Sequence, residues 1–358
     1  MIDRDRIVKT FCDLATIDSP SGEEEEVARF LTVRLKDLGF EVARDDYGNL
    51  VASEGGEDPF ILSGHMDTVE PGRGVKPIVD GDRIASDETT IVGGDCKAGV
   101  AAFLEALQSI KESGSTRRAV EVVMTREEEP GLIGARHLDF SMIKGKEAIV
   151  FDGEGPPSRI TSASPTYTGF VIGVKGLSAH AGMEPEKGIS AIRIAAELIT
   201  KLPQGRLDPE TTFNVGLIEG GQVRNAVPET TRIIGEFRAV DKDTHESVRR
   251  QLETALEETR SAHPEATIEH SMKTEFEAYR LTDDDPTTRR IKAAIESLGM
   301  EPTMHTSGGG TDGNVFRLNG ISAVVVGMAV TGMHTRQEWV SIPGLVDTAR
   351  LCETLLLL

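Results

Sequence analysis

Short runs of mainly apolar residues recur along this chain and predict buried β-strands. Four such runs lie outside the middle of the sequence, at 60–62, 120–124, 148–151 and 323–326. Helical segments separate the first three runs, notably residues 98–110. Strands covered on both faces produce such runs, and their alternation with helices is typical of a sheet with a parallel centre. We therefore expect an α/β fold in these parts of the chain.

The first 50 residues predict two helices and a hairpin. Ser21 and Glu24 have the spacing of a capping box, and apolar residues then recur at helical spacing from Val27 to Leu38. The acidic run 23–26 matches the first turn of that helix, where negative charge is favourable. We interpret the run as helix-terminal charge rather than as a metal site.

The middle of the chain follows a different pattern. Strands are expected at 168–174, 212–218, 230–239 and 266–272, with helices at 188–202 and 243–261. This βαββαβ order is the ferredoxin-like arrangement of an α+β domain. The prediction is an inserted domain of ordinary size at 166–277, which interrupts an α/β domain formed by 1–165 and 278–358.

Composition narrows the classes of function. A length of 358 residues suits two domains, and 38% hydrophobic residues exclude a disordered protein. The formal charge of −20 argues against nucleic acid or an anionic membrane as a partner. No apolar stretch approaches the roughly 18 residues of a membrane span, and the first residues lack a signal-peptide core, so we expect a cytoplasmic protein. Three scattered cysteines make a disulfide framework unexpected.

Metal-competent side chains follow several of the predicted strands. They are His65 and Asp67, the glutamates 127–129, Asp152 and His334, while Asp95 lies just before the helix at 98–110. Open α/β sheets place their sites beyond the carboxyl ends of the strands, so these side chains are expected to converge. Two imidazoles with several carboxylates suit zinc, or cobalt or manganese, better than calcium or an iron–sulfur cluster.

Each of these signals has an ordinary structural alternative. An aspartate at 95 or 152 can cap a helix or a loop, and a run of glutamates can be a solvated turn. Their coincidence at successive strand ends favours a metal site. Two ions about 3.5–4 Å apart would need one bridging carboxylate and would activate a shared water.

Eight segments of the chain together resemble the dinuclear zinc exopeptidase family of peptidase T, carboxypeptidase G, the aminoacylases and succinyl-diaminopimelate desuccinylase. They are SGHMDTVEPG, GGDCKAGVAA, TREEEPGLIGARHLD, VFDGEG, GLSAHAG, GGQVRNAVPE, GGTDGN and MHTRQEW. The resemblance spans the whole chain and is greatest to peptidase T-like members. It implies a zinc-exopeptidase catalytic domain, with a mixed sheet flanked by helices, and an inserted ferredoxin-like lid domain through which some members dimerise.

The resemblance also implies a set of metal ligands. His65 and Asp152 would bind one zinc ion, and Glu129 and His334 would bind the other. Asp95 would bridge the two ions.

Three further residues acquire catalytic roles from the same resemblance. Glu128 would be the general base that takes a proton from the zinc-activated water and returns it to the departing amine. Asp67 would orient His65. His180, in the lid, would donate to the tetrahedral oxyanion, and in dimeric members the partner subunit supplies this histidine.

Four positions match family residues that hold the substrate: Asn225, Arg238, Gly309 and Gly310. An arginine fork suits a carboxylate, and glycines let the backbone approach a ligand closely. For Arg238, near the end of a predicted strand, a structural ion pair is the alternative. For the glycines the alternative is a flexible turn.

The expected function is a cytoplasmic aminopeptidase that uses two zinc ions to hydrolyse short peptides, with a possible homodimer through the lid. Gly308 stands where peptidase T has an arginine, and Cys96 replaces a common aspartate, so strict tripeptide preference stays open. The alternatives are an amidohydrolase of N-acyl amino acids, a carboxypeptidase, or a non-catalytic peptide-binding protein. The last should lack a ligand or the base, and none is missing.

Overall fold

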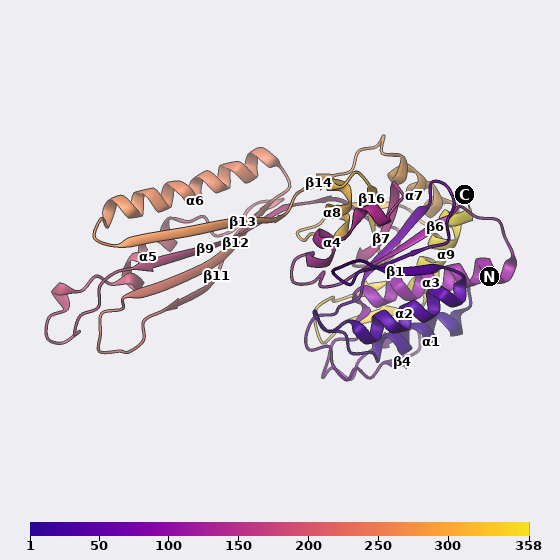
Figure 1. Ribbon diagram of the computed structural model, residues 1–358, viewed down its shortest axis with the longest axis horizontal. Coiled ribbons are helices and arrows are strands. Elements are labelled where there is room, and N and C mark those ends of the chain that lie inside the picture. Colours follow the sequence, from indigo (N-terminus) through magenta and orange to yellow (C-terminus); the bar gives the residue numbers. More distant parts are fainter. Residues whose placement is uncertain (358) are drawn as a thin grey trace. The chain divides into compact units, whose positions relative to one another are not determined.

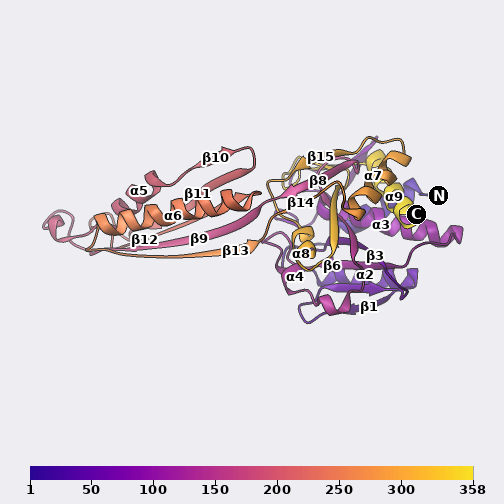
Figure 2. The same cartoon turned by 90° about the horizontal axis from the view of Figure 1, so that it is seen from above.

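The computed structural model describes residues 1–357 and contains two compact units (Figures 1 and 2). The first unit consists of Met1–Ser162, Leu281–Ser307 and the chain from Thr311 onward. The second consists of Ala163–Arg280 together with Gly308–Gly310. Among the described residues, no helix is both long enough and apolar enough to cross a membrane.

A mixed sheet carries the core of the first unit. Its strands are β1 (Glu41–Arg44), β2 (Leu50–Ser53), β3 (Phe60–His65), β6 (Val120–Thr125), β7 (Glu147–Gly153), β8 (Arg159–Ser164), β14 (Tyr279–Arg280), β15 (Thr303–Thr306) and β16 (Ser322–Gly327). The order is β1-β2-β6-β3-β7-β16-β8-β14, and β15 pairs with β8. Strands β6, β3, β7 and β16 are parallel, whereas β1, β2, β8 and β14 pair antiparallel. The predicted parallel centre is confirmed.

Helices cover both faces of these central strands. They are α1 (Arg4–Ala15), α2 (Glu25–Leu38), α3 (Gly94–Ser113), α4 (Ile133–His137), α7 (Pro286–Ser297), α8 (Asp312–Leu318) and α9 (Ile342–Leu357), with a short 3₁₀ turn η1 (Phe140–Met142). Helix α3 packs on β3 and β7 and contacts α1, α2 and α9. On the other face, Phe316 of α8 packs against Ile61, Val123 and Val150. Because both faces are buried, these strands are the mainly apolar runs seen in the sequence.

A second, smaller sheet of the first unit holds the segment that contains His334. It consists of β17 (Val330–Thr331), β18 (Trp339–Ser341), β5 (Arg83–Ala85) and β4 (Ile78–Asp80), in that order. The loop between β17 and β18 is thereby fixed at both ends.

The capping box predicted at the start of α2 is wrong. Glu24 is the N-cap residue, but its side chain makes no capping hydrogen bond. The hydroxyl of Ser21 donates instead to Asp67 Oδ2, at 2.7 Å. Ser21 binds Asp67 and Glu24 binds Arg126, so neither side chain is available for the capping interaction.

The second unit has the predicted ferredoxin-like fold. It contains β9 (Thr166–Lys175), η2 (Pro185–Lys187), α5 (Ala191–Lys201), β10 (Gly205–Asp208), β11 (Thr211–Gly220), β12 (Thr230–Ala239), α6 (Lys242–Ala262) and β13 (Thr267–Phe276). The sheet is antiparallel in the order β10-β11-β12-β9-β13. Buried residues of α5 and α6 pack on one face of it, against Phe170, Phe213 and Phe237. The short edge strand β10, which is fully exposed, was not predicted.

Candidate metal centre

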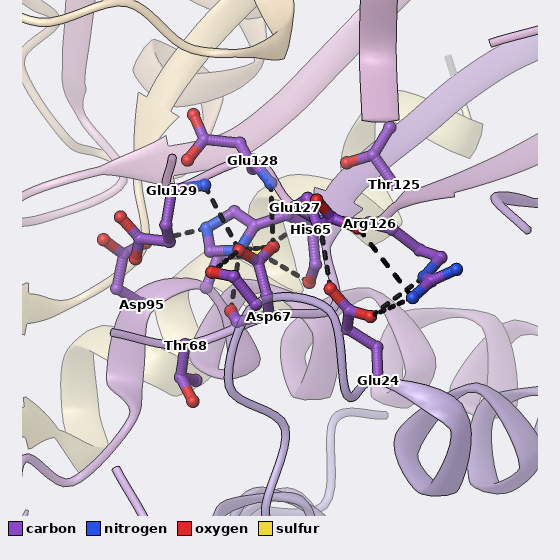
Figure 3. A network of polar contacts seen from close by, with 12 residues as sticks. Glu24, His65, Asp67, Thr68, Asp95, Thr125, Arg126, Glu127, Glu128 and Glu129 are labelled. Atoms are coloured by element: carbon purple, nitrogen blue, oxygen red, sulfur yellow. Dashed lines mark hydrogen bonds and ion pairs between the residues drawn. The ribbon is translucent and has the colours of Figure 1, made fainter. Parts of the chain in front are cut away.

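The carboxyl ends of the parallel strands place His65 beside several carboxylates, including those of Asp67 and Asp95 (Figure 3). His65 ends β3, Glu128 and Glu129 follow β6, and Asp152 lies near the end of β7. Asp95 lies in the first turn of α3, and His334 lies in the loop between β17 and β18. The fold of the first unit therefore brings together these six residues, which come from separate segments of the sequence.

Asp95 faces both histidines, each with a different oxygen. Its Oδ1 lies 3.2 Å from Nε2 of His65, and its Oδ2 lies 3.0 Å from Nε2 of His334. His65 Nε2 also lies 3.7 Å from Asp152 Oδ1, and His334 Nε2 lies 3.1 Å from Glu129 Oε2. The result is two clusters of nitrogen and oxygen atoms that share one carboxylate.

One further group of close ligand atoms places Glu128 at the same centre. Potential ligand atoms of His65, Glu128 and Asp152 all lie within 4.8 Å of one another. The same holds for His65, Asp95 and Glu129. Glu128 is 7% exposed, so its carboxyl group is held in a largely dry environment.

The electrostatics of the cluster suit bound cations. Burial, and then repulsion by Asp152, raises the pKa of Glu128 well above its usual range. Burial, and then repulsion by Asp95, does the same to the pKa of Asp152. Hydrogen bonds to Asp95 and Glu129 raise the pKa of His334 to about 10. The causes of these shifts show a buried excess of negative charge, which a divalent cation would offset.

An unpartnered atom supports the same fit. Glu129 Oε1 is buried and has no hydrogen-bond partner among the described residues. Buried polar atoms are normally paired, so an oxygen left free beside other potential ligands fits a metal ion. The mixed imidazole and carboxylate donor set is the type that zinc, cobalt and manganese accept.

Asp67 contacts both His65 and the glutamate loop, which consists of residues 126–129. Nδ1 of His65 lies 2.9 Å from the backbone oxygen of Asp67 and 3.4 Å from Oδ1. The Asp67 carboxylate accepts the backbone N–H groups of Glu128, at 2.9 Å, and Glu129, at 3.2 Å. This side chain therefore fixes the glutamate loop as directly as it fixes His65.

Two buried residues that the sequence analysis missed complete the support of this loop. Asn49 Oδ1 accepts the N–H of Arg126 at 3.0 Å, and Glu24 Oε1 accepts the N–H of Glu127 at 3.1 Å. Glu24 also pairs with the Arg126 guanidinium at 2.8 Å (Figure 3). Four successive amides, from 126 to 129, are thus held by buried acceptors. In the acidic run 23–26 the sequence distinguished Glu24 only by its capping-box spacing from Ser21, which gave no sign of a contact with residues 126 and 127.

The other predicted site residues lie in the second unit. His180 is exposed, and its Nδ1 accepts the N–H of Gly182 at 3.2 Å. Asn225 is also exposed, and its loop lies beside that of His180. The N–H of Ala181 donates to the backbone oxygen of Asn225 at 3.0 Å. These contacts place His180 and Asn225 on adjoining loops of one unit.

Arg238 makes the ion pair that the sequence left as an alternative. Its guanidinium lies 2.8 Å from Glu236 and 4.6 Å from the centre of the Tyr167 ring, and it donates to the oxygen of Gly308 at 3.0 Å. The oxygen of Gly309 accepts from Ser164 at 2.8 Å.

Gly310 is closely packed within the second unit. A Cβ at this position would lie 2.3 Å from the ring of Phe276. The lack of a side chain at Gly310 is therefore explained by contact with protein.

Comparison with known proteins agrees with this architecture. A family model described as a peptidase dimerisation domain matches residues 163–264, and a model of peptidase family M28 matches residues 48–155. The Bacillus subtilis protein YqjE, described as uncharacterized, is 37% identical over 98% of this chain and 97% of its own length.

Two solved structures are similar over the whole chain. Aminopeptidase PepT from Bacillus cereus is 35% identical, with a TM-score of 0.90 over 99% of this chain and 98% of the other. A tripeptidase from Staphylococcus aureus is 31% identical, with a TM-score of 0.94 over 100% of this chain and 98% of the other. These identities confirm the resemblance found in the sequence. The chain is a member of the M20 family of metal-binding peptidases, which includes peptidase T, carboxypeptidase G2 and succinyl-diaminopimelate desuccinylase, and it is a hydrolase of that family.

Proposed function

We propose that this chain is a zinc-dependent aminopeptidase that removes the first residue of short peptides. The observation that carries the proposal is that the two carboxylate oxygens of Asp95 face different histidines. Asp152 lies beside His65, and Glu129 lies beside His334. In this proposal His65, Asp95 and Asp152 hold one ion, and Asp95, Glu129 and His334 hold the second.

The metal chemistry would come from the bound ions and the proton chemistry from Glu128. Two divalent ions, when bound, lower the pKa of a water between them and polarise the scissile carbonyl. Glu128 accepts the proton of the attacking water on a carboxylate oxygen and delivers it to the departing amine. Asp67, through the N–H groups of residues 128 and 129, keeps that carboxylate in place.

His180, Asn225 and Arg238 stay predictions for substrate binding and oxyanion stabilisation. The ion pair of Arg238 with Glu236 leaves its guanidinium partly neutralised, and a substrate carboxylate would compete with Glu236 for it. Substituting His180 with alanine should lower kcat without changing the zinc content. An unchanged kcat would remove His180 from the mechanism.

The choice of short peptides with a free amino end rests on the two solved relatives above 30% identity, one called an aminopeptidase and the other a tripeptidase. The peptidase dimerisation domain match over 163–264 supports a homodimer as the working form. Light scattering of the purified chain tests the dimer directly.

An assay of substrate class tests the proposal. Metal-stripped protein is given zinc, cobalt or manganese, and release of free amino acid is measured from unblocked tripeptides and from N-acetylated amino acids. The proposal predicts metal-restored release of the first residue of the tripeptides. Turnover of the acylated substrates alone would instead identify an amidohydrolase, and release of the last residue would identify a carboxypeptidase.

A further inference from the structure

A buried carboxylate outside the proposed ligand set holds the turn that presents Asp95. Glu338 is 1% exposed and lies four residues after His334, in the loop between β17 and β18. Its Oε2 accepts the N–H groups of Val92, Gly93 and Gly94, at 3.0, 2.8 and 3.3 Å. Its Oε1 lies 3.4 Å from the N of Asp95.

The turn has a shape that suits an anion. Gly93 has a φ of +72°, a left-handed conformation that glycine adopts readily. Successive amides in such a turn can point to one side and form a concave anion site. In this chain the anion is internal, because the Glu338 side chain fills the site.

The surrounding packing leaves the turn little freedom. A Cβ at Gly94 would lie 2.9 Å from Val330 of β17 and 3.1 Å from Val340 of β18. The same small sheet therefore contacts the turn through its strands and binds it through Glu338. His334, on the loop between these strands, lies 3.0 Å from Asp95.

We propose that Glu338 is a positioning residue for the metal centre, which locks the turn of Asp95 to the loop of His334 so that both are aligned before an ion binds. The inference rests on the proposed function, since it assumes that Asp95 and His334 hold metal. Glu338 itself contributes no ligand atom. Its carboxylate binds the amides of residues 92–95, and Glu338 itself belongs to the loop of His334. The side chain therefore links the turn of Asp95 to that loop.

The chain offers a matched control for a purely structural role. Glu121 is also 1% exposed, and its carboxylate accepts the backbone N–H groups of Lys144, at 3.0 Å, and Gly145, at 2.9 Å. Neither of these residues is a proposed ligand. Glu121 and Glu338 are thus buried carboxylates that both bind backbone N–H groups. Only the turn bound by Glu338 contains a proposed metal ligand, Asp95.

The test compares the zinc affinity of the metal-stripped wild type, E338Q, E338D and E121Q by competition with a chromogenic chelator, alongside thermal unfolding of each metal-free protein. Removing outer groups that orient ligands typically weakens metal binding by roughly 10–100-fold, and E338Q should show a loss in that range. E338D, which keeps the charge on a shorter stem, should bind zinc more tightly than E338Q but less tightly than the wild type. E121Q should unfold at a lower temperature but keep wild-type zinc affinity.

Wild-type zinc affinity in E338Q would overturn the inference, as would an equal loss in E121Q. If E338Q does not fold, E338D decides the matter, because wild-type affinity in that variant would also overturn it. A wild-type chain that binds no zinc would contradict the proposed function itself, and the inference with it.

Discussion

Replacing Glu24 with glutamine would disturb the glutamate loop without touching any proposed ligand. Glu24 accepts the N–H of Glu127 at 3.1 Å and that of Gly22 at 2.8 Å, and it pairs with the Arg126 guanidinium at 2.8 Å. The amide of glutamine keeps one acceptor oxygen. It turns an NH₂ group toward donors, and it leaves Arg126 without its carboxylate.

The structure sets the size of the effect. Breaking a buried ion pair costs about 3–5 kcal/mol, and a hydrogen bond to a charged group contributes about 1.5–3 kcal/mol. The Arg126 side chain is 27% exposed, so water can solvate part of its charge. We therefore expect the free energy of unfolding to fall by about 3 kcal/mol, at the lower end of the range for buried pairs.

Activity should fall as well, because the loop that carries Glu128 loses one of its anchors. A displacement of about 1 Å at a reacting group can cost about 100-fold in rate, so we expect kcat/KM to fall at least about tenfold. Urea unfolding and peptide hydrolysis measure the two effects.

The matched control is Glu23→Gln, which removes an exposed ion pair with Arg73 whose side chains are 63% and 47% exposed. Exposed pairs contribute about 0–1 kcal/mol, so this variant should stay near wild type. If Glu24→Gln lost no more stability or activity than Glu23→Gln, the anchoring of the loop by Glu24 would be refuted.

Two other substitutions separate the roles of the units. Glu128→Gln should keep its bound zinc while kcat falls by about 100-fold or more, since general base catalysis contributes about 10²–10⁴-fold; full activity with zinc bound would show that another group is the base. Phe237→Ala removes a fully buried ring that stacks on Phe213 at 6.0 Å, and it should lower the stability of the second unit by about 3–5 kcal/mol, as measured by urea unfolding. All proposed ligands belong to the first unit, so metal analysis should find unchanged zinc content, and lost zinc would contradict a centre formed by the first unit alone.

The parts of the fold that follow from local pattern could be predicted from the sequence. The apolar runs became β3, β6, β7 and β16, since strands buried on both faces have few polar positions to interrupt them. The convergence of metal-competent side chains at the ends of β3, β6 and β7 followed, because the ends of parallel strands meet at one edge of a sheet. The assignment of each ligand and of the base came from the family resemblance. Strand β10 was missed because it is short, polar and exposed on both faces.

The support around the centre depends on contacts between residues far apart in the sequence. Glu24 binds a loop 103 residues away, and Glu338 binds a turn 246 residues away at Val92. No local spacing records such pairs, and at Glu24 the local signal of a capping box pointed to a different partner. The ion pair of Arg238 could be predicted from local spacing, because Glu236 lies two residues earlier and side chains at that spacing share a face of a strand.

The number of zinc ions needed for activity tests the central claim most directly. Metal-stripped protein is titrated with zinc while bound metal and cleavage of an unblocked tripeptide are followed together. The shared position of Asp95 predicts that release of the first residue reaches its plateau at two ions per chain. Full activity of protein that binds no zinc, or a plateau at one ion with no second ion bound, would contradict the dinuclear centre.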